Sequence, residues 1–183
     1  VYDLSGTGAV SAQALLVGGH GTGTFTHSGG TNTVLGDLTL GSQETGVGTY
    51  DLAGTGELSV QGRLIVGESG TGDFDQDGGS CAVGGDLAIG SEEAGRGMYR
   101  LAASVELSVQ GQLIVGGSGT GEFDQNGLLQ VDTLYVGRQG AGAFTQTMGA
   151  TAITGTAYIA VAPGATGTCS LAGGTLSADA AYI

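Results

Sequence analysis

Apolar and polar residues alternate in short runs along almost the whole chain. Residues 57–60 read Glu-Leu-Ser-Val, and residues 64–67 read Leu-Ile-Val-Gly. Strict alternation over four or five residues is the period of a β-strand, and no segment shows helical spacing. Glycines lie in pairs or triplets between these runs, as they do in turns between short strands. The pattern therefore predicts an all-β chain of many short strands.

The same pattern recurs at a fixed period. Residues 48–67 closely resemble residues 97–116, and an inward aromatic position returns every 21 to 25 residues. The anchors are Tyr2, Phe25, Tyr50, Phe74, Tyr99, Phe123 and Phe144, with Cys169 in the equivalent place of the last unit. Self-similarity at this period is typical of solenoids. Eight such units fill residues 1–183, so we expect one domain.

Each unit contains three short strands. The first is Gly-x-Tyr/Phe-x-Leu/Gln, the second resembles residues 57–60 and the third resembles residues 64–67. We therefore expect a single β-solenoid, or β-helix, of about eight coils with 21–25 residues per coil. Coils stacked about 4.8 Å apart make a rod roughly 38 Å long. Tyr and Phe coils alternate, which indicates that a pair of coils is the duplicated unit.

Stacking turns each position of the coil into a column. The column two residues after the aromatic anchor is predicted to be buried, with glutamine amides bonded inside the ladder. It contains Leu4, His27, Leu52, Gln76, Leu101, Gln125, Gln146 and Leu171. The column between these two points outward and places Arg100 between Asp75 and Asp124.

The middle residue of the third strand forms another column that alternation points outward. It contains Leu16, Thr39, Ile65, Ala88, Ile114, Tyr135, Tyr158 and Tyr182. A continuous apolar stripe marks an interaction surface, although strands favour β-branched and aromatic residues in any case. Residues 141–183 carry one charged residue, Asp179. We predict an interface made of Leu16, Ile65, Ile114, Tyr135, Tyr158 and Tyr182.

The chain is strongly acidic. Seventeen carboxylates against four arginines and no lysine give a formal net charge of −13. Such a chain repels phosphate backbones and anionic lipid head groups, so we expect neither nucleic acid nor a membrane surface as partner. No apolar stretch is long enough to span a bilayer, so we expect no transmembrane segment.

One motif suggests a metal. Asp73, Asp75 and Asp77 match the opening of a calcium loop, D-x-D-x-D-G, but the twelfth position is Gly84 where such loops have glutamate. The interpretation we favour is an outward acidic strand face, with calcium bridging between coils as the alternative.

The remaining reactive side chains are predicted to be structural. His20 and His27 have no ligand or triad partners at suitable spacing. Cys81 and Cys169 are expected to be buried thiols four coils apart, too far for a disulfide. We expect no catalytic residue and no cofactor, because the short turns cannot build the groove of a polysaccharide-active β-helix enzyme.

Neither end of the predicted stack carries a cap. Val1 starts within a first strand and Ile183 ends at a third strand. Two interpretations fit: an excerpt of a longer solenoid, or coil faces that stack head-to-tail through Val1 and Ile183 into a filament.

The repeat Gly-x-Tyr/Phe-x-Leu/Gln, followed by Leu-x-Val and Leu-x-Val/Ile-Gly, occurs at residues 23–41, 48–67, 72–90 and 97–116. It resembles the glycine-rich repeats of bacterial surface and secreted β-solenoids, such as autotransporter passenger domains and related adhesins. The resemblance implies an exported bacterial protein, extracellular or at the cell surface, with no cofactor.

Two functions remain open from the sequence. The first is a non-enzymatic structural subunit that self-associates head-to-tail, laterally or both, into a filament or surface fibre. The second is an adhesin or stalk segment of a longer surface protein, which binds a surface or matrix ligand.

Overall fold

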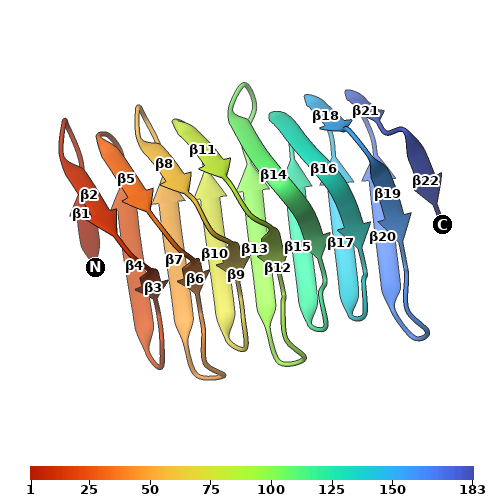
Figure 1. Cartoon of the computed structure of the whole chain (residues 1–183), viewed down its shortest axis with the longest axis horizontal. Coiled ribbons are helices and arrows are strands. Elements are labelled where there is room, and N and C mark those ends of the chain that lie inside the picture. Colours follow the sequence, from red (N-terminus) through yellow and green to blue (C-terminus); the bar gives the residue numbers. More distant parts are fainter.

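The computed structural model describes all residues, 1–183, and contains strands and turns but no helix. The chain winds into a β-solenoid of about eight coils whose parallel strands stack along one axis (Figure 1). The predicted fold class is therefore confirmed. Coils are numbered here from the N-terminus, and each begins with a strand of the first sheet.

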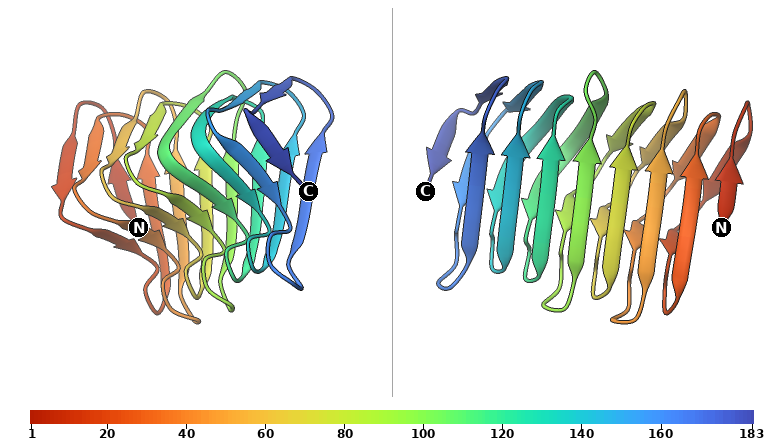
Figure 2. Two further views of the ribbon diagram at one scale, coloured as in Figure 1. Left: turned by 45° about the vertical axis from the view of Figure 1, so that its right-hand side comes forward. Right: turned by 180° about the vertical axis from the view of Figure 1, so that it is seen from behind.

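One wall of the solenoid is an eight-stranded parallel sheet made of the first strand of every coil. These strands lie side by side in chain order, as the right-hand view of Figure 2 shows. They are β1 (Tyr2–Leu4), β4 (Thr22–His27), β7 (Val47–Leu52), β10 (Thr71–Gln76), β13 (Arg96–Leu101), β15 (Thr120–Gln125), β17 (Ala141–Gln146) and β20 (Thr166–Leu171).

The opposite wall contains the second and third strands of the coils. The second strands are β2 (Ala9–Ala12), β5 (Thr31–Val34), β8 (Glu57–Val60), β11 (Ser80–Val83), β18 (Ala150–Ile153) and β21 (Thr175–Ser177). The third strands are β3 (Leu15–Val17), β6 (Leu38–Leu40), β9 (Leu64–Val66), β12 (Leu87–Ile89), β19 (Thr156–Ile159) and β22 (Ala180–Tyr182). In coils 5 and 6 the two strands merge into β14 (Glu106–Val115) and β16 (Leu128–Val136). These two long strands join the second and third strands into one sheet.

The register of the stack is the one that the sequence predicts. Phe74 pairs with Tyr50 on one side and with Tyr99 on the other. Arg100 lies between Asp75 and Asp124, as expected. The alignment of Cys81 with Leu58 is also confirmed.

The aromatic anchors form one continuous stack inside the solenoid. From Tyr2 to Phe144, ring centroids of successive coils lie 4.6 to 5.5 Å apart. The rings between Tyr50 and Phe144 are fully buried. Aromatic pairs at such distances stabilise by about 0.5–1.5 kcal/mol beyond the area that they bury. The stack thus couples each coil to the next at the centre of the core.

A second buried column explains why Tyr and Phe coils alternate. Tyr coils have leucine two residues after the ring, whereas Phe coils have histidine or glutamine there. Each interior tyrosine bonds to that polar group of the preceding coil: Tyr99 donates its hydroxyl to Gln76 Oε1 at 2.6 Å, and Tyr50 bonds to His27 Nδ1 at 3.0 Å. The two-coil period of the sequence is therefore the period of a buried hydrogen bond.

The alternation breaks between coils 6 and 7. Gln125 is followed one coil later by Phe144, not by a tyrosine, and Gln125 Oε1 has no hydrogen-bond partner. Its amide nitrogen still donates to Ala150 O at 2.8 Å and to Thr151 Oγ1 at 3.0 Å. One acceptor is thus left unpaired where the pattern fails.

Two glycines let the end of the third strand of coil 3 lie close to the first strands of coils 4 and 5. Gly67 follows β9 with φ of +73°, and a Cβ there would lie 2.1 Å from the carbonyl oxygen of Arg96. Gly72 points into the coil, where a Cβ would lie 2.2 Å from the nitrogen of Gly67. Any side chain would push the two backbones apart at this corner.

The outermost coils are less buried than the others, since each has one neighbouring coil in the structure. Tyr2 and Leu171 are both 51% exposed, although their columns are closed elsewhere. The prediction of a buried Cys169 is wrong for the same reason. Cys169 continues the aromatic column on β20, which has a neighbouring strand on one side only, and its side chain is exposed.

Substituting Gly67 by alanine should destabilise the protein far more than substituting Gly6. Both glycines have positive φ, +73° and +63°, but a Cβ on Gly6 meets nothing within 4 Å. We expect Gly6→Ala to lower the free energy of unfolding by about 1–2 kcal/mol from backbone strain. Gly67→Ala adds a backbone clash and should lower it further. Chemical denaturation measures both, and equal effects would contradict the close approach.

Phe144→Tyr should stabilise the protein, because the new hydroxyl can donate to the unpaired Gln125 Oε1 as Tyr99 donates to Gln76. We expect a gain of about 0.5–1.5 kcal/mol in the free energy of unfolding. The matched control is Phe123→Tyr, whose hydroxyl would face the column of Leu101 and find no glutamine in the preceding coil. Thermal unfolding compares the two, and a gain in Phe123→Tyr equal to that in Phe144→Tyr would refute the pairing rule.

Candidate interaction surfaces

The outer column of the third strands is exposed at its two ends and covered in its middle. Leu16 is 57% exposed and Tyr182 is 61% exposed, whereas Ile65 and Ile114 are 2% and 8% exposed. The prediction of a continuous exposed stripe is therefore wrong at Ile65 and Ile114.

At Ile114 the outer column lies beside turns that follow the third strands. Ile65 and Ile114 do not belong to the inner core, so alternation gave their direction correctly. The turn residues Ser91, Gly117 and Arg138 line a shallow hollow together with Ile114. Ile114 therefore lies within a hollow beside these turns and not on a ridge.

Three tyrosines continue the column toward the C-terminal coils. The rings of Tyr135 and Tyr158 lie 4.9 Å apart, and those of Tyr158 and Tyr182 lie 5.4 Å apart. The guanidinium of Arg138 lies 5.2 Å from the centroid of Tyr135. We call Tyr135, Tyr158 and Tyr182 the outer tyrosine stack. Its rings lie partly to largely exposed on a part of the chain that has little charge.

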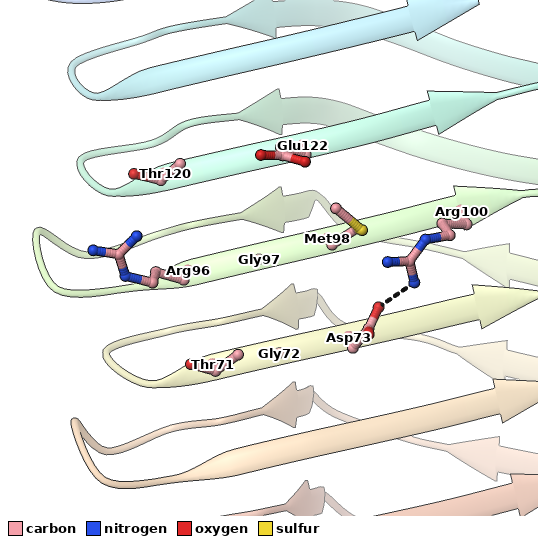
Figure 3. Close-up of a pocket in the computed structure, with 9 residues that line it drawn as sticks. All are labelled: Thr71, Gly72, Asp73, Arg96, Gly97, Met98, Arg100, Thr120 and Glu122. Atoms are coloured by element: carbon pink, nitrogen blue, oxygen red, sulfur yellow. Dashed lines mark hydrogen bonds and ion pairs between the residues drawn. The ribbon is translucent and has the colours of Figure 1, made fainter.

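Several acidic side chains lie on the outer face of the first sheet. Arg100 Nη1 lies 2.8 Å from Asp73 Oδ1 and 2.7 Å from Asp75 Oδ1 (Figure 3 shows the bond to Asp73). Asp77 follows β10 in an exposed turn. The sequence placed Arg100 beside Asp75 correctly, but it missed the second bond, to Asp73, which lies two residues away along β10.

Burial and mutual repulsion raise the pKa of two carboxyls on this face. Asp51 is affected by burial first and then by Asp75, Asp73 and Asp77. Asp73 is affected by burial and by Asp75, and Arg100 partly opposes both. No group of three histidine, cysteine, aspartate or glutamate side chains is placed to hold a metal ion. Calcium at Asp73, Asp75 and Asp77 stays a prediction.

The remaining candidate side chains have different surroundings. Cys81 is buried between Leu58 and Leu107, and burial raises the pKa of its thiol to about 12. His27 is fully buried and bonded at both ring nitrogens. His20 is exposed in a turn, where its carbonyl accepts a hydrogen bond from Thr45 Oγ1 at 2.9 Å.

Comparison of the chain with protein-family models, with curated proteins and with solved structures finds no match. The structure holds no helix with the length and apolar character needed to cross a membrane.

Asp51→Asn should raise the melting temperature at pH 7. The raised pKa of Asp51 means that the fold disfavours its charged form, through burial and through repulsion by neighbouring carboxylates, and the neutral amide removes both costs. The gain should vanish near pH 3, where the carboxyl is protonated in both folded and unfolded chains. Arg100→Gln is the opposite control and should lower the melting temperature at pH 7. If the gain from Asp51→Asn persisted at pH 3, the charge of Asp51 would not be its cause.

Proposed function

We propose that the protein is a non-enzymatic structural subunit whose coils stack end to end with those of further copies, building an extracellular filament or surface fibre. One observation carries this proposal. The two outer coil faces present the same ladder positions that join coils inside the molecule, and these positions are apolar on both faces.

The two faces match column by column. In the continued register, Cys169 would lie over Tyr2, Leu171 over Leu4 and Tyr182 over Leu16. Further along the coil, Leu176 would lie over Val10 and Ala181 over Leu15, with Ile183 beside Val17; these columns follow from the strand pairing inside the chain. Each of these pairs is apolar.

The face of coil 1 has room for such a partner. An apolar hollow opens there between β1 and β3, and its lining includes Val1, Tyr2, Val10 and Leu15. The backbone groups on the outer edges of β1 and β20 have no strand beside them, and an unpaired edge of this kind accepts another strand. Because the two faces differ, their contact does not close into a ring of two but continues as a filament.

The extracellular location and the absence of catalysis are parts of the same proposal. The resemblance of the repeats to those of bacterial surface β-solenoids supports the location. The turns between strands contain only a few residues, which favours a wall-like scaffold over an enzyme with a loop-built groove.

The outer tyrosine stack favours a second function, an adhesin or stalk segment. Stacked aromatic side chains on a surface with little charge suit contact with a surface or matrix ligand, and Arg138 adds one cation beside them. In that case substitution of Tyr135 and Tyr158, which lie away from the end-to-end contact, by serine would abolish ligand attachment. It would leave end-to-end assembly intact.

Disulfide trapping tests the end-to-end contact and its register. In Tyr2→Cys, the new thiol should lie next to Cys169 of another copy. Strands paired in register bring Cα atoms to about 5 Å, inside the range that a disulfide accepts. Mild oxidation should give a ladder of covalent multimers on non-reducing gels and filaments by electron microscopy. Cys81 is buried and should not react.

Two controls define the contact. Asp3→Cys places a thiol on the other face of β1, so it should give far fewer multimers. Tyr2→Cys combined with Cys169→Ser should give none beyond head-to-head dimers. Monomers alone in Tyr2→Cys, or equal cross-linking in Asp3→Cys, would overturn the proposal.

A further inference from the structure

His27 is a basic group enclosed in an apolar core. Its side chain has no exposed surface. Leu4 of coil 1 and Leu52 of coil 3 lie on either side of it in the ladder. The rings of Phe25 and Tyr50 meet it edge-on, with centroids 6.3 and 6.1 Å away.

The hydrogen bonds of His27 are all satisfied by a neutral ring. Nε2 lies 3.1 Å from the carbonyl oxygen of Gly30, which can only accept, so Nε2 carries the proton. Nδ1 therefore accepts, from the hydroxyl of Tyr50 at 3.0 Å. The amide nitrogen of Asn32 in turn donates to the same hydroxyl at 3.0 Å, while Asn32 Oδ1 has no partner. The three side chains form a one-way relay that ends on the unprotonated nitrogen.

No anion stands near enough to compensate a charge on His27. Tyr50 of β7 is the one titratable group that contacts the ring, and burial raises its pKa well above the ordinary value. The packed neighbours from β1, β4 and β5 are Leu4, Phe25 and Asn32, which carry no charge. A proton on Nδ1 would thus face a donor inside an apolar enclosure, which disfavours the charged form.

We propose that His27 is an acid-sensitive switch that loosens coils 1 to 3 while the rest of the solenoid stays folded. Protonation removes the acceptor for the Tyr50 hydroxyl and places an uncompensated charge between coils 1 and 3. In a solenoid each coil contacts only its neighbours, so a local loss of stability opens the nearest end of the stack first. The inference concerns the unassembled chain, in which coil 1 has one neighbouring coil.

The direction of the pH effect follows from the pKa of His27. Burial lowers it, and the bond to the Gly30 carbonyl opposes this only in part. A lowered pKa in the folded state means that stability is intact above the unfolded value of about 6.5 and falls as the pH drops below it. Asp51 and Asp73 act in the opposite direction, because their raised pKa values favour the fold as they take up protons. Asp51 lies in coil 3, beside the strand of His27, so variants of His27 are needed to separate the two effects.

Hydrogen–deuterium exchange at pH 7.0 and 5.0 tests the switch, with protection factors corrected for the intrinsic exchange rate. Amides of β1 to β9 should lose protection by up to about tenfold per pH unit below 6.5. Amides of β15 to β19 should keep theirs.

The control is His27→Gln, because glutamine fills the same column at Gln76 and accepts from a tyrosine hydroxyl there. This variant should keep equal protection at both pH values. His27→Leu, which matches Leu4 and Leu52, serves as a second non-titrating variant if the first folds poorly. Loss of protection at pH 5.0 in either variant, equal loss in coils 6 to 8, or no loss in the unsubstituted chain would each overturn the proposal.

Discussion

The in-register parallel pairing of each coil with the next is the constraint on which the rest of the structure depends. Because a coil has only two neighbours, every side chain must suit the residues at the same position one coil above and one coil below. The aromatic column satisfies this by stacking rings 4.6 to 5.5 Å apart, close to the spacing of the strands that carry them. The corner glycines satisfy it by leaving room where the backbone of a following coil passes.

The polar groups inside the solenoid follow the same constraint over two coils. A tyrosine hydroxyl needs an acceptor in the preceding coil, and a buried glutamine or histidine needs a donor in the next one. Tyr99 and Gln76 meet both needs at once. His27 meets them only while it is neutral, and Gln125 no longer meets them because Phe144 follows. The pattern thus changes at two places: at His27 the acceptor can be protonated, and at Gln125 the acceptor has no donor.

Most of the fold could be predicted because the repeat period and the alternation define coil, register and column together. The aromatic anchors and the column of Leu52, Gln76 and Leu101 lie where the sequence places them. The burial of Ile65 and Ile114 could not be predicted, since strand alternation gives the direction of a side chain and not what lies beside it, such as the turns around Ile114. Cys169 was misjudged because its burial requires a neighbour on both sides. The sequence shows that Tyr coils carry leucine and Phe coils carry glutamine or histidine two residues after the ring. The hydrogen bond from Tyr99 to Gln76 that explains this pattern could be recognised only from the positions of both side chains.

The most direct test of the account is the distance between spin labels along the outward column of the first sheet. Cysteine pairs would be introduced at positions 26 and 145, 3 and 145, and 3 and 170, in a chain with Cys169→Ser. These pairs span five, six and seven coil steps. Pulsed electron paramagnetic resonance should give mean distances that increase by about 4.8 Å for each added coil, from roughly 24 to 34 Å. Distances that fail to rise in this order, or that rise by a markedly different step, would contradict the stacked register.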